Sequence, residues 1–215
     1  LQNRRRDNAV IGPQYTGINN NTLLWEHCHN LIFEAGNEYR KAEFLSTRYP
    51  GMHGESVRWI DPFYHYTMMT DYPRKNYLYD EDKNGLSVTR YDSNGDADYE
   101  ADYVMMHFKL DMPCLSQDQQ VYVYGQWAGN NLNPTCRMQY NYSEQAYTAD
   151  ILMKCGYYNY IYLCAKNDSA RGYTHPTEGN FFQTENEYDI LVYHKPTGTR
   201  YWQLVGCVTP IYRNK

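Results

Sequence analysis

Hydrophobic and polar residues alternate most clearly in the second half of the chain. Residues 157–165 (YYNYIYLCA) place Tyr158, Tyr160 and Tyr162 on one side of an extended strand, and Asn159, Ile161 and Leu163 on the other. Segments of the same kind, separated by turn residues, lie at 103–110, 121–124, 138–142, 146–152, 187–193 and 200–208. Seven strands in about 110 residues are typical of an immunoglobulin-like sandwich.

The first half shows shorter apolar segments at 22–33, 39–46, 56–60 and 63–69, each closed by Gly, Pro, Asn or Asp. Strands of this length at such spacing indicate a sandwich or a barrel. Because no segment keeps apolar residues at helical spacing for three turns, the sequence predicts an all-β protein.

The stretch 80–102 (DEDKNGLSVTRYDSNGDADYEAD) is polar and holds one short strand around residues 86–91. We place a domain boundary here. The prediction is two immunoglobulin-like β-sandwich domains. Residues 1–90 form the first, which need not be complete at its N-terminus, and residues 91–215 form the second.

Composition supports strands and argues against one class of partner. Tyrosine supplies 25 of the 215 residues, and its ring suits a half-buried pleated face while its hydroxyl reaches water. The formal net charge of −5 is unsuited to nucleic acid, which requires a basic surface. The one basic run, residues 4–6, is predicted to be a solvated tail.

No apolar run reaches about 18 residues, so no segment is expected to span a bilayer. The chain begins at Leu1 without a start Met or a signal-peptide core, and this beginning reads as an internal boundary. The six cysteines form no CxxC and no zinc-finger spacing. We expect mostly free, buried thiols, Cys155 and Cys164 among them.

Two motifs suggest metal ligands. Asp80, Asp82 and Asn84, followed by Gly85, copy the start of a calcium loop, although Tyr91 stands where the loop needs Glu. A structural calcium ion is one interpretation and a solvated turn is the other. His27 and His29 would share one face of a strand and could chelate a metal, or could be half-exposed strand histidines.

Motifs for catalysis are absent from the sequence, since it contains no GxSxG, HExxH, P-loop or Rossmann glycine pattern. We therefore expect no enzyme and no cofactor apart from the calcium alternative. Trp127, in the turn after VYVY, and the neighbouring Tyr124 are candidates for an aromatic platform that binds glycan. Exposed Tyr and Trp side chains would equally anchor a protein interface.

The second half resembles the carbohydrate-binding-module-48 and glycogen-binding early-set immunoglobulin family. The resemblance lies in VYVYGQWAGN (121–130), in residues 138–142 and in AYTADILMKCGYYNYIYL (146–163). In sugar-binding members tryptophans contact glucan, and Trp127 matches one such position. The resemblance implies a glycan ligand, as the alternative function.

A resemblance that covers more of the chain is to the plug protein family of the Bacteroidetes type IX secretion system. The matching segments are LIFEAGNEYRKAEFLSTRYPGM (31–52), DPFYHYTMM (61–69), PRKNYLYDEDKNG (73–85), EADYVMMHFKL (100–110), GYYNYIYL (156–163) and EGNFFQTENEYDILVYHKPTGTRYWQLVG (178–206). It implies a series of immunoglobulin-like domains at the periplasmic side of the outer membrane. The implied partner is the translocon barrel, which the plug closes without catalysis.

Overall fold

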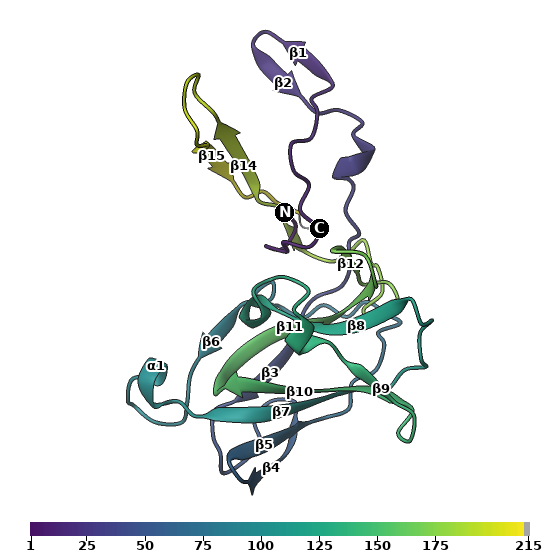
Figure 1. Cartoon of the computed structure of the whole chain (residues 1–215), viewed down its shortest axis with the longest axis vertical. Helices are drawn as coiled ribbons and strands as arrows, with labels where there is room; N and C mark the ends of the chain where they lie inside the picture. Colours follow the sequence, from purple (N-terminus) through teal and green to yellow (C-terminus); the bar gives the residue numbers. More distant parts are fainter. Residues whose placement is uncertain (213–215) are drawn as a thin grey trace.

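The computed structural model describes residues 1–212, which form an all-β sandwich of two five-stranded sheets with three two-stranded sheets beside it (Figure 1). The first sheet has the order β4 (Gly54–Ile60), β5 (Phe63–Met68), β7 (Tyr103–Leu110), β10 (Ala146–Lys154) and β9 (Gln139–Asn141). Its neighbouring strands are antiparallel except β5 and β7, which are parallel.

The second sheet is built around β11 (Gly156–Lys166). Its first half pairs with β3 (Arg40–Phe44) and β6 (Ser87–Thr89), and its second half pairs with β8 (Gln119–Tyr124) and β12 (Gly172–Tyr173). All four pairings are antiparallel, so one long strand organises the whole sheet.

The inner faces of the two sheets share one apolar core. Met106 and Phe108 of β7 and Ile151 of β10 pack there with Phe44 of β3 and Tyr160 of β11. The opposite face of β11 is also buried, since Ile161 and Leu163 pack against Tyr39 and Tyr124. The alternation predicted for residues 157–165 is confirmed, and both of its faces lie in the interior.

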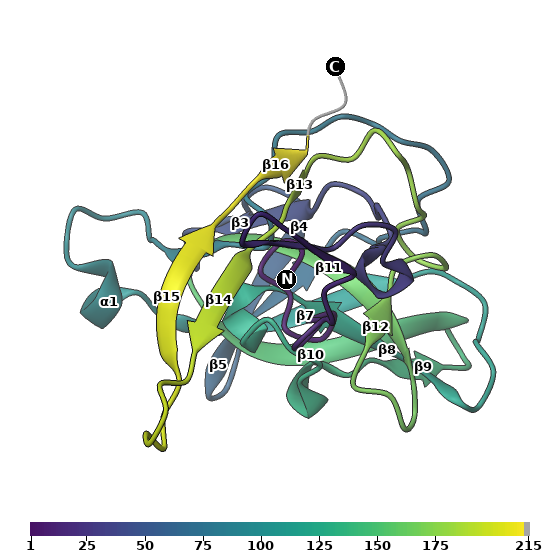
Figure 2. The ribbon, with the colours of Figure 1, turned by 90° about the horizontal axis from the view of Figure 1, so that it is seen from above.

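Two hairpins project from the same end of the sandwich, near the N-terminus (Figures 1 and 2). One joins β1 (Gly17–Asn19) to β2 (Thr22–Leu24) through Asn20 and Asn21, whose positive φ angles of 45° and 63° suit a tight hairpin turn. The other joins β14 (Ile190–His194) to β15 (Gln203–Val208).

The remaining elements are short. β13 (Asn186–Glu187) pairs with β16 (Ile211–Tyr212), and the helical turns are η1 (His29–Leu31), α1 (Ala97–Glu100), η2 (Gln126–Ala128) and η3 (Pro134–Cys136). No helix within residues 1–212 is long and apolar enough to cross a membrane. The six cysteines, all within the described range, are free thiols, and Cys155 and Cys164 are buried.

The boundary expected at residue 90 does not separate two sandwiches. β5, from the first half of the sequence, pairs with β7 from the second half. β3 and β6 likewise pair with β11. Local turn signals in 80–102 suggested a linker, but strand pairing is decided by contacts distant in sequence. The segment 22–33 is corrected as well, because only Thr22–Leu24 is a strand there.

Candidate functional site

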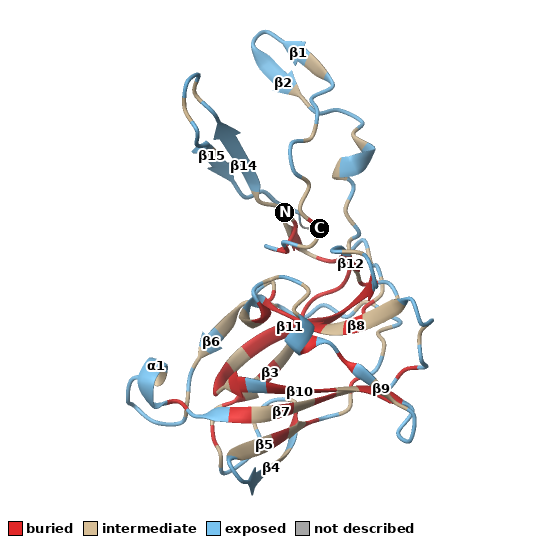
Figure 3. Cartoon of the chain, viewed as in Figure 1, coloured by how far each residue is buried: buried red, intermediate tan, exposed pale blue. Residues whose placement is uncertain are grey.

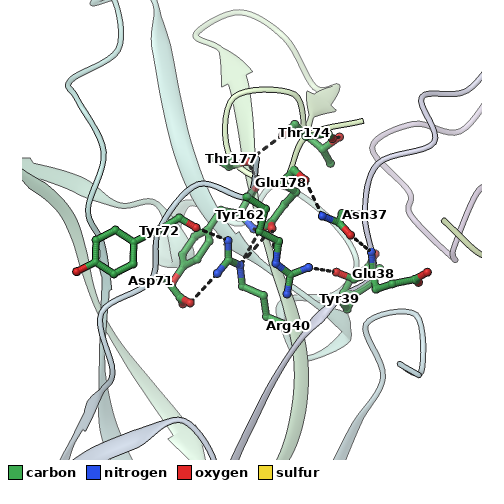
Figure 4. A network of polar contacts seen from close by, with 12 residues as sticks. Asn37, Glu38, Tyr39, Arg40, Asp71, Tyr72, Tyr162, Thr174, Thr177 and Glu178 are labelled. Atoms are coloured by element: carbon green, nitrogen blue, oxygen red, sulfur yellow. Dashed lines mark hydrogen bonds and ion pairs between the residues drawn. The ribbon is translucent and has the colours of Figure 1, made fainter. Parts of the chain in front are cut away.

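A buried polar network joins β3, β11 and the loops that follow β5 and β12 (Figure 4). Arg40 donates from Nη1 to Oδ1 of Asp71 at 2.6 Å and from Nε to Oε1 of Glu178 at 3.0 Å. The Glu178 side chain is fully buried, and Nε of Arg74 lies 3.5 Å from its Oε2. Two cations and two carboxylates thus neutralise one another, as burial of charge requires.

Asp71 collects hydrogen bonds from three further side chains. Its Oδ2 accepts from the hydroxyls of Tyr160 at 2.8 Å and Tyr162 at 2.7 Å, and its Oδ1 lies 3.1 Å from Nε2 of His53. Burial alone raises the pKa of Asp71, but the hydrogen bond from His53 and the charge of Arg40 outweigh it and hold that pKa below its ordinary value. The carboxyl group is therefore ionised at neutral pH.

The network fixes the loop that leads to the projecting hairpin β14–β15. Oε1 of Glu178 accepts from the backbone N–H of Tyr162 at 2.9 Å, and Oγ1 of Thr177 donates to the Tyr162 carbonyl at 2.5 Å. Burial, together with Asp71, raises the pKa of the Tyr162 phenol well above its ordinary value, so the hydroxyl stays a donor. The charged groups are paired with one another, which suits a clamp between β11 and this loop.

A second buried ion pair corrects the expectation of a solvated tail at residues 4–6 for Arg5, while Arg4 and Arg6 are exposed. Nη2 of Arg5 donates to Oδ2 of Asp7 at 2.6 Å and to the carbonyl of Gly172 at 3.1 Å. Asp7 also accepts from the hydroxyl of Tyr124 at 2.9 Å. Tyr124 is 0% exposed, so it cannot contact a surface glycan. The charge pattern alone did not reveal that this segment covers the outer face of β11.

Trp127 packs inward rather than forming an open platform. Its ring stacks on Phe108 with an interplanar angle of 9° and meets Tyr158 edge-on at 80°. Its indole Nε1 is buried without a hydrogen-bond partner. Trp127 and Tyr124 therefore do not present the exposed pair of rings that the glycan hypothesis needs.

The calcium-like motif is a turn whose carboxylates already have partners. The side chain of Asp82 accepts from the backbone N–H groups of Asn84, at 2.8 Å, and Tyr39, and Asp80 pairs with Lys41. Asn84 adopts a positive φ of 51°, which Asn tolerates in turns. Within residues 1–212, no group of three or more His, Cys, Asp and Glu side chains is arranged to hold a metal ion.

The surface that stands out is the hairpin β14–β15, here named the apolar hairpin (residues 190–208). Both of its faces are exposed (Figure 3). Its large exposed apolar side chains are Ile190, Leu191, Val192, Tyr193, Tyr201, Trp202, Leu204, Val205 and Val208. Strands with continuous apolar runs are normally covered on both faces, and a two-stranded hairpin by itself is marginally stable. Contiguous exposed apolar patches are found at interaction surfaces among other places.

The neighbouring hairpin β1–β2 extends the apolar character of this end of the molecule. Ile18, Leu23 and Trp25 are exposed there, and Nε1 of Trp25 donates to the carbonyl of Pro13 at 2.9 Å. The sequence predicted the strands at 187–193 and 200–208 correctly, but it assigned them to the second sandwich. The continuous apolar runs ILVY and LVGCV were the available signal that both faces need a cover.

No protein-family model and no curated protein sequence matches the chain. Its structure is similar to the crystal structure of a hypothetical protein from Parabacteroides merdae, with a TM-score of 0.92 and 43% sequence identity. The match covers 99% of this chain and 54% of that protein, so the chain spans about half of that protein's length. At this identity the two share the all-β fold described above.

Proposed function

We propose that this protein is a non-catalytic interaction protein that binds another macromolecule through the apolar hairpin. The observation that carries this proposal is the exposure of apolar side chains on both faces of β14–β15. Covering them would remove a large apolar area from water at a gain of about 25 cal/mol per Å². Trp202 directly precedes β15 and is 65% exposed. Large aromatic side chains of this kind often anchor protein interfaces.

The architecture of the sandwich suits a rigid support for such a surface. The buried Arg40–Asp71–Glu178 network holds the loop that precedes β13. The residues just before the hairpin are held by backbone N–H bonds from Glu187 to Asn3, from Tyr188 to Pro210 and from Asp189 to Leu1, so the hairpin starts from a fixed base. Preorganisation of this kind lowers the entropy cost of binding. We further propose that the sandwich is a variant of the immunoglobulin-like architecture, one that includes the parallel pair β5–β7.

The resemblance to the type IX secretion plug family is the basis for proposing a partner and a location. It extends through residues 178–206, which include β14 and the first strand positions of β15. We propose that the protein acts at the periplasmic side of the outer membrane, and that its partner is the translocon barrel. An apolar hairpin on a sandwich can enter a wide barrel mouth or join a strand edge there.

The test uses the purified chain and the purified translocon barrel in detergent, with binding followed by biolayer interferometry. Val205 in the apolar hairpin and Val88 in β6 are each 58% exposed, which makes them matched sites for the same substitution. We expect Val205→Glu to weaken binding at least tenfold, because a carboxylate would be desolvated in the interface. Val88→Glu should bind like the wild type.

Three outcomes decide the proposal. Binding that is lost with Val205→Glu alone supports it. Absence of binding by the wild type overturns the assignment of the barrel as partner. Equal binding by wild type and Val205→Glu shows that the apolar hairpin is not the contact surface.

A further inference from the structure

Two histidines from neighbouring strands meet on the outer face of the first sheet. His65 lies on β5, His107 lies on the parallel neighbour β7, and Asp150 of β10 is opposite His107. Tyr66 and Met106, the residues next to the two histidines in sequence, belong to the core. Because side chains alternate along strands, the three polar side chains share the face turned away from the core.

The ring nitrogens of this pair face one another. Nδ1 of His65 lies 2.8 Å from Nε2 of His107, and the rings are stacked with an interplanar angle of 21°. Nδ1 of His107 lies 2.6 Å from Oδ1 of Asp150. An ionised carboxylate only accepts hydrogen bonds, so this contact places a proton on Nδ1 of His107 and leaves Nε2 with a lone pair toward His65.

We propose that His65 and His107 bind a divalent transition-metal ion, and that Cu²⁺ is the preferred ion. With metal–nitrogen bonds of about 2.0–2.1 Å, two neighbouring ligands in a square-planar site lie about 2.9 Å apart. The two nitrogens are already 2.8 Å apart and share a hydrogen bond, which Nδ1 of His65 donates when Nε2 of His107 carries the lone pair. On metal binding this proton leaves Nδ1, and the neutral His65 ring carries its proton on Nε2 instead. Cu²⁺ favours this geometry and binds such ligands most tightly among the first-row divalent ions.

The surroundings fit imidazole ligation at a half-exposed surface. Asp150 accepts from the ring nitrogen of His107 that would not bind the metal, an arrangement that orients metal-binding histidines in many proteins. The His107 side chain is 31% exposed, so an ion can reach the pair. Arg58, opposite His65, and Lys109 add positive charge that lowers the affinity. Asp150 contacts the far ring nitrogen of His107, and within residues 1–212 no third His, Cys, Asp or Glu is arranged with the pair to hold a metal ion, so water would complete the coordination.

Titration of the full chain with Cu²⁺ in a non-coordinating buffer, followed by electron paramagnetic resonance, tests this site. We expect one Cu²⁺ per chain with hyperfine coupling to two imidazole nitrogens. His65→Gln and His107→Gln should each remove that signal, and Asp150→Asn should weaken binding about 10–100-fold. Circular dichroism of each variant checks that the sandwich is folded.

The matched control is the double variant His27→Gln/His29→Gln, which alters the other histidine pair of the sequence and should bind as the wild type does. Loss of the copper signal in this double variant would overturn the proposal. A signal that His65→Gln leaves unchanged would overturn it as well.

Discussion

The hydroxyl of Tyr162 lies 2.7 Å from Oδ2 of Asp71, although 91 residues separate the two in the sequence. Tyr162 projects from β11 into the space between the sheets, and Asp71 lies just beyond β5 of the opposite sheet. The contact therefore ties the two layers of the sandwich together. Arg40 joins it from β3, so one carboxylate beyond the first sheet binds polar groups from two strands of the second sheet.

Asp71→Asn should destabilise the protein by about 2–4 kcal/mol. The substitution removes the negative charge that balances Arg40 and leaves buried donors with a weaker acceptor. Chemical denaturation at pH 7 measures the change in the free energy of unfolding. Asp168→Asn, at an exposed position, is the control and should stay within about 0.5 kcal/mol of the wild type. An Asp71→Asn protein as stable as this control would contradict the role assigned to the network.

Asp82→Asn should change the dependence of stability on pH. Burial raises the pKa of Asp82 to about 6, despite hydrogen bonds from the backbone N–H groups of Asn84 and Tyr39. Between about pH 4 and pH 6 the folded protein then binds more protons at this carboxyl than the unfolded chain does, so its contribution to stability falls as pH rises through that window.

The amide variant lacks this titration. Relative to the wild type, Asp82→Asn should therefore gain about 2 kcal/mol of stability on going from pH 4.5 to pH 7.5. Urea denaturation of both proteins at the two pH values measures this difference, and the other carboxyl groups cancel in the comparison. A difference that is the same at both pH values would show that Asp82 is not protonated in the folded protein near pH 5.

Gly156→Ala should lower stability by about 1–3 kcal/mol, because a Cβ at this position would lie 2.4 Å from the carbonyl oxygen of Val88. That oxygen belongs to the backbone of β6, so relief requires the strand to move away from β11. Gly206→Ala in β15 is the control, since its Cβ would meet only the side chain of Val192 at 3.7 Å. Thermal unfolding of the two variants should differ by several degrees. Equal melting temperatures would show that β6 can move away from β11 with little loss of stability.

Val205→Lys should leave the stability of the sandwich within about 0.5 kcal/mol, because Val205 is exposed and, within residues 1–212, the apolar hairpin pairs with no other sheet. The same change should lower the binding of a hydrophobic dye, since it interrupts the exposed apolar face. Dye fluorescence and thermal unfolding of one sample give both results. A drop of several degrees in melting temperature would mean that the hairpin contributes to the folded core.

Local pattern located most strands of the sandwich. The segment 103–110 is β7 as predicted, and 157–165 falls within β11. Both segments are short and rich in aromatic or apolar residues that alternate or run continuously, a pattern typical of strands. The tyrosines were read less well, because Tyr160 and Tyr162 place their hydroxyls on a buried carboxylate rather than in water. A local sequence pattern cannot predict a hydrogen-bond acceptor that lies some 90 positions away in the chain.

The histidines show the same limit. Proximity in sequence drew attention to His27 and His29, but His27 has a positive φ of 55° and His29 begins η1, so the two do not lie on a strand. His65 and His107 come together because β5 and β7 pair in parallel. The parallel pairing of two strands so far apart in sequence cannot be predicted from either segment alone.

The sequence by itself determined that the protein is all-β, because alternation and turn residues act within a few positions of one another. It also determined which segments are so apolar that burying their side chains away from water would be favourable. Only the tertiary structure decided which strands pair, that both halves of the chain build one sandwich, and that the apolar hairpin is left exposed. Those outcomes depend on contacts between segments that are distant in sequence. The energies of these contacts are shared among many residues, so no single stretch of the chain predicts them.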